Sequence, residues 1–158
     1  MKHPKVISLS EAVHIAEKLR KAKKNLVTTN GCFDILHVGH ARSFAMAKKL
    51  GDVLMVGINS DASVRANKGK LRPVVPQKER AELVASLEVV DYVFVFASKT
   101  PTSWLSKIKP AVHAKGSDRK IEEIPERHII EKNGGKLVLI PHTGKHSTSG
   151  IIKKILKR

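Results

Sequence analysis

Short apolar segments alternate along the chain with longer segments in which apolar residues recur at helical spacing. The apolar segments predict five strands, at residues 26–29, 53–58, 91–96, 110–114 and 137–140. The longer segments predict helices at residues 8–23, 38–50, 61–68, 76–87, 100–107 and 125–133, and a last helix from residue 147. Strands that are buried on both faces and joined by helices form parallel sheets. The pattern therefore predicts an α/β fold, a five-stranded, doubly wound, Rossmann-like parallel sheet with helices on both faces.

Residue choice at the predicted helix starts supports this order. Ser8 stands three residues before Glu11, which is the spacing of a capping box. Thr100 precedes a proline and is predicted to cap the helix at 100–107. Ser147 or Thr148 is predicted to cap the last helix. No internal repeat, low-complexity tract or long linker interrupts the pattern. We expect one domain over residues 1–158, with an N-terminal helix at about 8–23 and a core over about 25–158.

The net charge points to anionic ligands. Lysine and arginine number 30 against 14 aspartate and glutamate, which gives a formal net charge of +16. Such an excess attracts nucleic acid, anionic lipid or phosphorylated metabolites, although solvated surface lysines would also produce it. Aromatic residues make up only 4%, which weighs against a protein that stacks single-stranded bases on aromatic side chains. We expect phosphorylated small molecules as partners, and no nucleic acid.

No membrane span or secretory signal is visible in the sequence. The longest apolar runs, residues 53–58 and 92–97, are six residues each, whereas a membrane span needs ~20. The one cysteine, Cys32, can form no internal disulfide and supplies no cysteine-based zinc site. A cytoplasmic, reducing location without membrane contact is therefore expected.

The segment after the first predicted strand carries the most specific chemistry. Residues 28–40 read T-T-N-G-C-F-D-I-L-H-V-G-H, which places His37 and His40 on one face of a first helical turn. Gly39 between them leaves room for a ligand beside the backbone. A helix N-terminus attracts anions, and imidazoles there can donate hydrogen bonds to phosphate and stabilise developing charge. Two alternatives remain: a metal site, for which spacing shows no third ligand, and ordinary capping or core histidines.

The string G-x-F-D-x-x-H-x-G-H at residues 31–40 resembles the signature of the nucleotidyltransferases of the cytidylyltransferase-like superfamily. Further segments are similar to the sugar-phosphate adenylyltransferases that make ADP-activated heptose. These are residues 29–37, 57–65, 68–69, 72–73, 87–93 and 115–118, together with Arg80. Residues 147–149 before Ile151 resemble the closing signature of the superfamily, a helix N-terminus that binds nucleotide phosphates. The resemblance covers nearly the whole chain, whereas neither a G-x-G-x-x-G motif after the first strand nor a P-loop occurs.

The resemblance implies roles for individual residues. The catalytic residues would be His37, His40 and Lys68. The nucleotide would be held by Asn30, Gly31, Cys32, Phe33, Asp34, Gly39, Asn59, Gly116, Asp118, Ser147, Thr148 and Ser149. The substrate phosphate would be held by Lys70, Arg72 and Arg80. ATP would be a substrate with Mg²⁺ carried on its phosphates, and no metal site in the protein is expected.

Each role has a plainer alternative. Lys68 and Lys70 could be solvated loop charges, and Arg80 could pair with a neighbouring glutamate on its own helix. Cys32 is more typical of a small packed residue than of a nucleophile. Trp104 is interpreted as a core or interface residue. Three histidines without a motif are interpreted as structural: His113, His128 and His142.

The reaction implied is that of ATP with D-glycero-β-D-manno-heptose 1-phosphate, giving ADP-heptose and pyrophosphate by in-line attack of the sugar phosphate on the α-phosphate. The chain would be a stand-alone transferase without a fused sugar-kinase domain, and a homodimer or larger homo-oligomer. Arg119 and His146 depart from the heptose pattern, so the sugar is open. The alternatives are a glycerol-3-phosphate or other phospho-alcohol cytidylyltransferase, which Val90 and residues 141–144 disfavour, and a non-enzymatic nucleic-acid-binding module.

Overall fold

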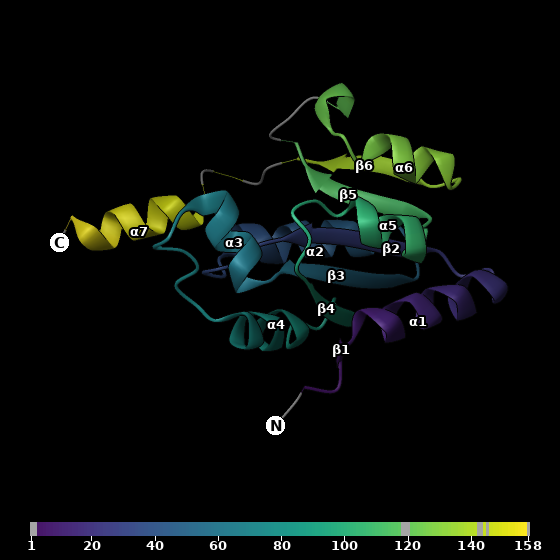
Figure 1. Ribbon diagram of the computed structural model, residues 1–158, viewed down its shortest axis with the longest axis horizontal. Coiled ribbons are helices and arrows are strands. Elements are labelled where there is room, and N and C mark those ends of the chain that lie inside the picture. Colours follow the sequence, from purple (N-terminus) through teal and green to yellow (C-terminus); the bar gives the residue numbers. More distant parts are fainter. Residues whose placement is uncertain (1–2, 118–120, 142–143, 145, 158) are drawn as a thin grey trace.

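A parallel sheet of six strands forms the centre of the protein (Figure 1). The computed structural model describes residues 3–117, 121–141, 144 and 146–157. The strands lie in the order β1-β4-β3-β2-β5-β6, and every neighbouring pair is parallel. Their bounds are β1 Val6–Ile7, β2 Leu26–Gly31, β3 Val53–Asn59, β4 Tyr92–Phe96, β5 Val112–Gly116 and β6 Lys136–Ile140.

The parallel, doubly wound sheet predicted from the sequence is confirmed, with one strand more than the five expected. The additional strand, β1, has two residues and pairs with β4 at the edge of the sheet. Two apolar residues show no period, which is why the pattern did not predict this strand. β5 also begins two residues later than expected and extends to Gly116.

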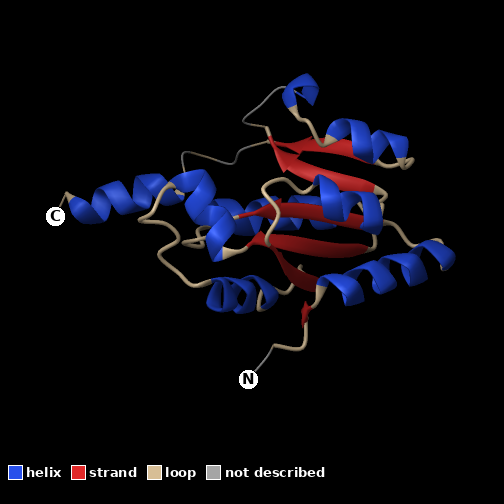
Figure 2. Ribbon diagram, in the orientation of Figure 1, coloured by secondary structure: helices blue, strands red, loops and turns tan. Residues whose placement is uncertain are grey.

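Helices cover both faces of the sheet (Figure 2). Their bounds are α1 Leu9–Lys21, α2 Val38–Lys48, α3 Asp61–Lys68, α4 Gln77–Ala85, α5 Thr102–Ile108, α6 Arg127–Lys132 and α7 Thr148–Leu156, with a 3-10 turn η1 at Ile121–Glu123. None of the helices in the described part of the chain is long and apolar enough to cross a membrane.

Helix caps test the local predictions directly. Ser8 forms the predicted capping box, because its hydroxyl accepts from Glu11 N at 3.2 Å and Glu11 Oε2 accepts from Ser8 N at 2.6 Å. Ser147 is the N-cap of α7, as one of the two predicted options required. The cap predicted at Thr100 is wrong: Pro101 occupies the N-cap of α5, and Thr100 instead accepts a hydrogen bond from Ser98 Oγ on its carbonyl.

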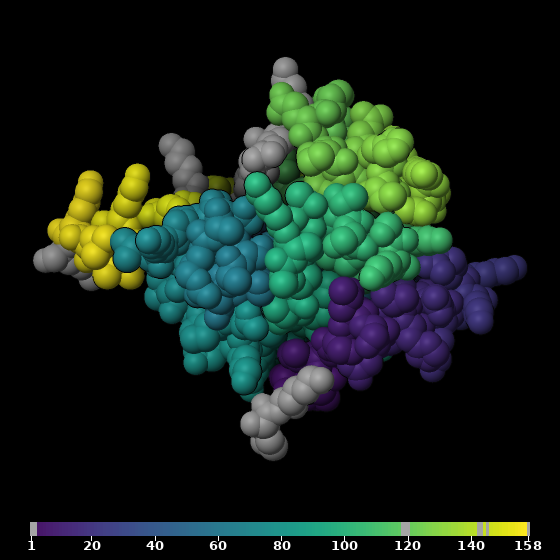
Figure 3. All heavy atoms as spheres, in the orientation of Figure 1, coloured from purple at the N-terminus to yellow at the C-terminus, as the bar shows by residue number. Residues whose placement is uncertain are grey.

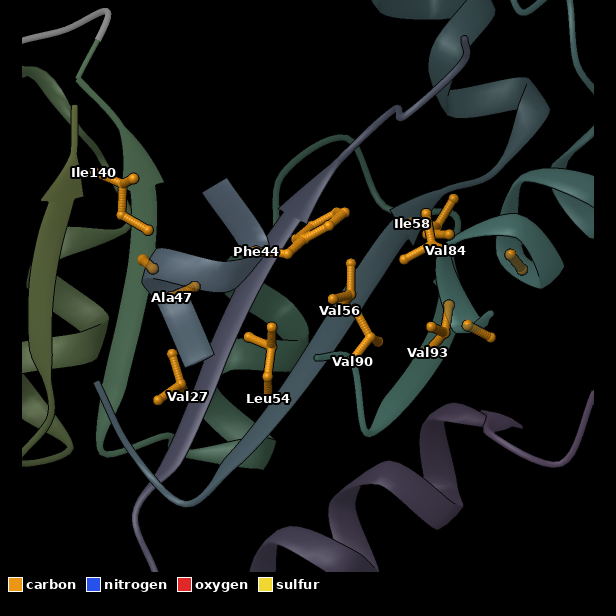
Figure 4. Packing of buried hydrophobic residues seen from close by; sticks show 13 residues of the cluster. Val27, Phe44, Ala47, Leu54, Val56, Ile58, Val84, Val90, Val93 and Ile140 are labelled. Carbon is orange, nitrogen blue, oxygen red and sulfur yellow. The ribbon is translucent and has the colours of Figure 1, made fainter. Parts of the chain in front are cut away.

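Two apolar layers flank the sheet because strand residues alternate between its faces. One layer packs Phe44 of α2 and Val84 of α4 against Val27, Leu54 and other buried strand residues (Figure 4). These side chains are fully or almost fully buried. The layer holds the end of β2 and the start of α2 in fixed positions, and the candidate site lies between them.

The second layer contains two of the residues that were interpreted as core or structural, Trp104 and His113. His128 is exposed in α6, and His142 lies outside the described residues. Trp104 of α5 is 1% exposed and packs edge-on against Phe94 at a centroid distance of 5.1 Å, which confirms its place in the core. His113 of β5 is fully buried, and its Nδ1 lies 2.8 Å from Thr28 Oγ1. Burial, and after it the charge of Lys115, lowers the pKa of His113 to about 3.

Candidate active site

Two adjoining cavities lie at the carboxyl ends of the strands, where open parallel sheets bind ligands. One, of about 520 Å³, is bounded by the loop after β2, the first turn of α2 and the start of α7, and we call it the histidine cavity. The other, of about 400 Å³, extends toward α5 and η1, and we call it the Glu126 cavity. Four residues line both: Asn30, Asn59, Lys115 and Gly116.

Most of the predicted site residues come together in the histidine cavity. They are Asn30, Gly31, Cys32, Phe33, Asp34, His37, Gly39, His40, Asn59, Lys68, Arg72, Gly116, Ser147, Thr148 and Ser149. Lys70 is exposed and does not line either cavity, and Arg80 is buried behind them. Asp118 and Arg119 lie outside the described residues. His146, a departure from the family pattern, lines the histidine cavity.

His37 and His40 form a stacked pair at the start of α2. His37 is the N-cap, in an extended conformation, and the two rings lie 3.8 Å apart at an interplanar angle of 18°. Burial, and then the neighbouring His37, lowers the pKa of His40 to about 4. Burial and His146 lower the pKa of His37. Both rings are therefore neutral at pH 7, which permits their close stacking.

The histidine pair is not satisfied by the protein itself. Neither the Nδ1 of His37 nor that of His40 has a hydrogen-bond partner within the described part of the chain, although both atoms are buried. Buried polar atoms without a partner are rare, because each loses its hydrogen bonds to water on folding. The pair thus has the features of a site whose partner is an incoming ligand.

Close packing explains two glycines of the motif. A Cβ added at Gly39 would lie 3.0 Å from the His37 ring and 3.3 Å from His146 Cβ. A Cβ added at Gly31 would lie 2.9 Å from the ring of Phe33, which contacts His40 edge-on at 5.3 Å. Gly39 was expected to make room for a ligand, and in the structure two histidine side chains occupy the space beside it.

Asp34 holds the loop of residues 69–76 against the turn after β2. It is 1% exposed, and its Oδ1 accepts from Val74 N at 2.8 Å and from Val75 N at 2.9 Å. Its Oδ2 accepts from Arg72 Nε at 2.5 Å. Burial raises the pKa of Asp34, but these hydrogen bonds and the Arg72 charge outweigh it, so the pKa lies below its usual value. In this arrangement, Asp34 and Arg72 position each other.

Arg80 crosses beneath the same turn and ties three segments together. Its side chain is fully buried and donates to the carbonyls of Val75, Cys32 and Asn59. It also donates to Asp61 Oδ1 at 2.6 Å, rather than to a glutamate on its own helix. These acceptors occupy the guanidinium and keep it out of both cavities, so its place is that of a positioning residue.

The start of α7 closes the histidine cavity. Ser147 Oγ accepts from Gly150 N at 3.1 Å, and Thr148 Oγ1 donates to Ile35 O at 3.3 Å, which attaches the helix to the loop after β2. The first backbone N–H groups of a helix have no intrahelical acceptors, and the helix dipole is positive there. Beyond this turn the helix projects from the body of the protein (Figure 3).

Several lining residues were not predicted. Lys115 lines both cavities and donates from Nζ to Glu126 Oε1 at 2.6 Å. Lys99, Thr100 and Glu126 line the Glu126 cavity. Lys115 is the penultimate residue of β5, so the rule that ligands bind at the carboxyl ends of strands could have identified it. Glu126 follows an irregular segment, and no local signal marks it.

Metal and thiol chemistry find little support among these groups. Within the described residues, no three His, Cys, Asp or Glu side chains are grouped as metal ligands. Burial raises the pKa of the Cys32 thiol above its ordinary value, although the charges of Lys68, Arg80 and Arg72 oppose this effect. Cys32 is therefore a protonated thiol at neutral pH, which is a poor nucleophile.

Comparison with known proteins places this geometry in a family context. Residues 28–154 match the family described as Cytidylyltransferase-like. The bifunctional protein HldE of Geobacter sulfurreducens is 42% identical over 153 residues, which are 97% of this chain and 31% of that protein. That of Helicobacter acinonychis is 44% identical over 153 residues, which are 97% of this chain and 32% of that protein. The chain thus spans about a third of the length of these relatives.

A solved structure shows a similar fold. The lipopolysaccharide core biosynthesis protein from Thermoplasma volcanium GSS1 superimposes with a TM-score of 0.65 at 30% sequence identity. The match covers 78% of this chain and 99% of that chain.

Proposed function

The chain belongs to the cytidylyltransferase-like family, and we propose that it transfers the adenylyl group of ATP to D-glycero-β-D-manno-heptose 1-phosphate, with release of pyrophosphate. The observation that carries the reaction type is the half-buried histidine pair beside two helix N-termini, whose buried Nδ1 atoms have no hydrogen-bond partner among the described residues. The choice of sugar is supported by the motif resemblance and by the relatives of similar sequence.

The reaction is an in-line displacement. A phosphate oxygen of the sugar phosphate attacks the α-phosphorus, the bond from that phosphorus to the bridging oxygen breaks, and the electron pair leaves with pyrophosphate. His37 and His40 donate hydrogen bonds to the oxygens that gain charge, and the start of α7 binds the leaving phosphates. No covalent intermediate on the protein is required, in keeping with the protonated thiol of Cys32.

Ligand binding is coupled to proton uptake at the histidines. With the site empty, burial keeps the pKa of His40 at about 4, so the ring is neutral. A polyphosphate beside it favours the imidazolium, which raises this pKa. We therefore expect the enzyme to take up a proton as it binds ATP. His40 would then carry a positive charge only when phosphate is bound.

Mg²⁺ fits this site as a companion of the nucleotide rather than as a resident of the protein. The carboxylate of Asp34 is fully occupied by hydrogen bonds. Glu126, paired with Lys115 through Oε1, has only Oε2 left and belongs to no group of three potential metal ligands among the described residues. Phosphate oxygens remain as the natural ligands of the ion, as is usual for Mg²⁺. Its contribution when bound is to neutralise charge on the phosphates.

The test is a pyrophosphate-release assay with Mg²⁺ that crosses ATP and CTP with heptose 1-phosphate and glycerol 3-phosphate. We expect release with ATP and heptose 1-phosphate alone. Release with CTP and glycerol 3-phosphate would overturn the proposal in favour of a phospho-alcohol cytidylyltransferase. Silence in every combination, with duplex DNA binding that weakens steeply as salt rises, would favour the nucleic-acid-binding module.

Location and assembly belong to the same proposal. A cytoplasmic enzyme is proposed because both substrates are phosphorylated intracellular compounds. A homodimer or larger homo-oligomer also stays a prediction, which sedimentation equilibrium of the purified chain would test against a single 17.4 kDa species.

A further inference from the structure

A buried carboxylate in the Glu126 cavity has one oxygen without a partner. Glu126 is 4% exposed and lies at the N-cap of α6. Its Oε1 accepts from Lys115 Nζ at 2.6 Å, whereas its Oε2 has no hydrogen-bond partner among the described residues. A charged atom buried in this way loses its hydration without compensation, and such atoms concentrate where a ligand completes the hydrogen bonding.

The other unpartnered polar atoms divide between the site and the core. Asn30 Oδ1 and the Nδ1 atoms of His37 and His40 belong to residues that line the cavities, as Glu126 does. The remaining two in the described chain, on Trp104 and His113, lie in the core behind them. Glu126 Oε2 is therefore one of several atoms around a single site that have no hydrogen-bond partner in the described chain.

The direction of the proposed reaction assigns each cavity a ligand. In an in-line displacement, the attacking and leaving oxygens lie on opposite sides of the α-phosphorus. His37, His40 and Thr148 line only the histidine cavity, where the pyrophosphate leaves. The acceptor then enters from the opposite side, through the Glu126 cavity. The residues that line both cavities mark the point where the two substrates meet.

The charges of the Glu126 cavity select which part of the acceptor lies there. An ionised carboxylate only accepts hydrogen bonds and repels phosphate, so its partner is a neutral donor such as a hydroxyl group. Lys115, paired with the carboxylate and shared by both cavities, can meanwhile face the phosphate of the acceptor. A ligand with a phosphate at one end and hydroxyl groups at the other matches this order.

We propose that Glu126 accepts a hydrogen bond from a hydroxyl group of the acceptor sugar and so determines specificity for a polyhydroxylated acceptor, with Lys115 holding the carboxylate in place. This inference rests on the proposed function, because it identifies the acceptor side from the direction of adenylyl transfer. A site built to pair with a hydroxyl rejects analogues that lack it, because the buried group is then left unpaired.

The first experiment is a double-mutant cycle in which one change is made in the protein and the other in the substrate. The wild type and Glu126→Gln are assayed for kcat/KM with heptose 1-phosphate and with a series of its single-deoxy analogues. We expect the variant to lose roughly 10- to 100-fold with the full sugar. For the analogue that lacks the contacted hydroxyl group, kcat/KM of the wild type should fall by a similar factor relative to the full sugar. For the same analogue, kcat/KM of Glu126→Gln should fall little further. Equal losses by both enzymes for every analogue would overturn the contact.

A matched control separates this role from an anchoring role for α6. Glu131→Gln removes the exposed ion pair between Glu131 and Arg127 on the same helix, and should leave all kinetic constants unchanged. A merely structural Glu126 would lower the melting temperature of the variant and alter the KM values of ATP and sugar phosphate together. The proposal requires the KM of the sugar phosphate to rise while that of ATP stays constant. A rise for ATP alone would place the contact on the nucleotide and overturn it.

A binding measurement distinguishes failure of this contact from failure of the proposed function. Heptose 1-phosphate is titrated calorimetrically into the wild type and into Glu126→Gln without ATP. If the variant binds heptose 1-phosphate more weakly than the wild type, but the wild type releases no pyrophosphate, the reaction is refuted and the contact is supported. Equal binding and turnover by both enzymes would support the reaction but refute the contact, and absence of binding to the wild type would refute the contact as well.

Discussion

The two cavities of the site handle charge in opposite ways. In the histidine cavity, His37 and His40 are neutral and have unpartnered buried nitrogens. In the Glu126 cavity, the carboxylate is already paired with Lys115, and one of its oxygens remains unmet. The histidines of the first cavity can become protonated when a polyanion binds. The carboxylate of the second cavity offers a fixed hydrogen-bond acceptor to a neutral group. Adjoining cavities can thus sort the charged and the uncharged parts of two substrates.

The largest expected effect comes from removing one ring of the histidine pair. His40→Ala should lower kcat for pyrophosphate release on the order of 10²–10³-fold, because a preorganised donor to developing charge is lost. The melting temperature should fall only slightly, since the variant loses the ring contacts of His40 with His37 and Phe33 but no hydrogen bond of its Nδ1 within the described chain. His128→Ala, an exposed position in α6, is the control. An unchanged kcat for His40→Ala would refute the catalytic role of the histidine pair, and with it the contrast between the two cavities.

Substitution of Arg80 tests whether the histidine cavity depends on the hydrogen bonds that this residue donates to the segments beside it. Arg80→Met leaves Asp61 and three backbone carbonyls without their donor. We expect the free energy of unfolding in urea to fall by about 2–4 kcal/mol, because a buried charge partner is removed. Arg65→Met, an exposed position in α3, should change it by less than about 0.5 kcal/mol. Full stability together with weakened substrate binding would instead indicate direct phosphate contact by Arg80.

The histidine pair was predictable because its residues are close in sequence, whereas the more distant lining residues of the histidine cavity were predicted from the family resemblance. His37, Gly39 and His40 occupy one helical turn, so their relation follows from the helix period alone. What the pattern could not predict was which polar groups the fold would bury. Asp34 and Arg72 are 38 residues apart and pair with each other, and Arg80 is enclosed by backbone carbonyls.

The Glu126 cavity was not predictable because its residues come from separate connections. Lys99 follows β4, Lys115 is the penultimate residue of β5, and Glu126 precedes α6. Only tertiary packing brings them together, although Lys115 stands in a segment that resembles the family and Glu126 stands in the predicted helix at 125–133. The edge strand β1 was missed for a related reason, since its pairing with β4 spans more than 80 residues.

Acid titration should separate the histidine of the site from the histidine of the core. The pKa values of His40 and His113, about 4 and about 3, lie below 6.5. The unfolded chain therefore binds protons first as the pH falls. Stability is fully present above pH 6.5 and declines toward pH 4, by at most ~1.4 kcal/mol per pH unit for each histidine.

Added pyrophosphate should sharpen that separation. Urea unfolding is measured at pH 7.5 and at pH 5.0, with and without pyrophosphate. We expect the ligand to offset the loss due to His40, because it stabilises the imidazolium, and not the loss due to the enclosed His113. His113→Asn should flatten the pH dependence that remains. If pyrophosphate stabilises the protein equally at both pH values, proton uptake at the histidine pair is refuted.

The smallest expected effect concerns two lysines at the end of α3 and just after it. Both lysines are exposed, but Lys68 lines the histidine cavity, whereas Lys70, two residues later, lines neither cavity. Lys70→Ala should raise the KM of ATP only about two- to threefold at low ionic strength, through the general field, and this rise should vanish in 0.5 M salt because exposed charges are screened. Lys68→Ala should raise it about tenfold, with a smaller dependence on salt, because the charge is part of the cavity wall. A salt-resistant effect of Lys70→Ala would show that the loop closes over the substrate and brings Lys70 into direct contact with phosphate.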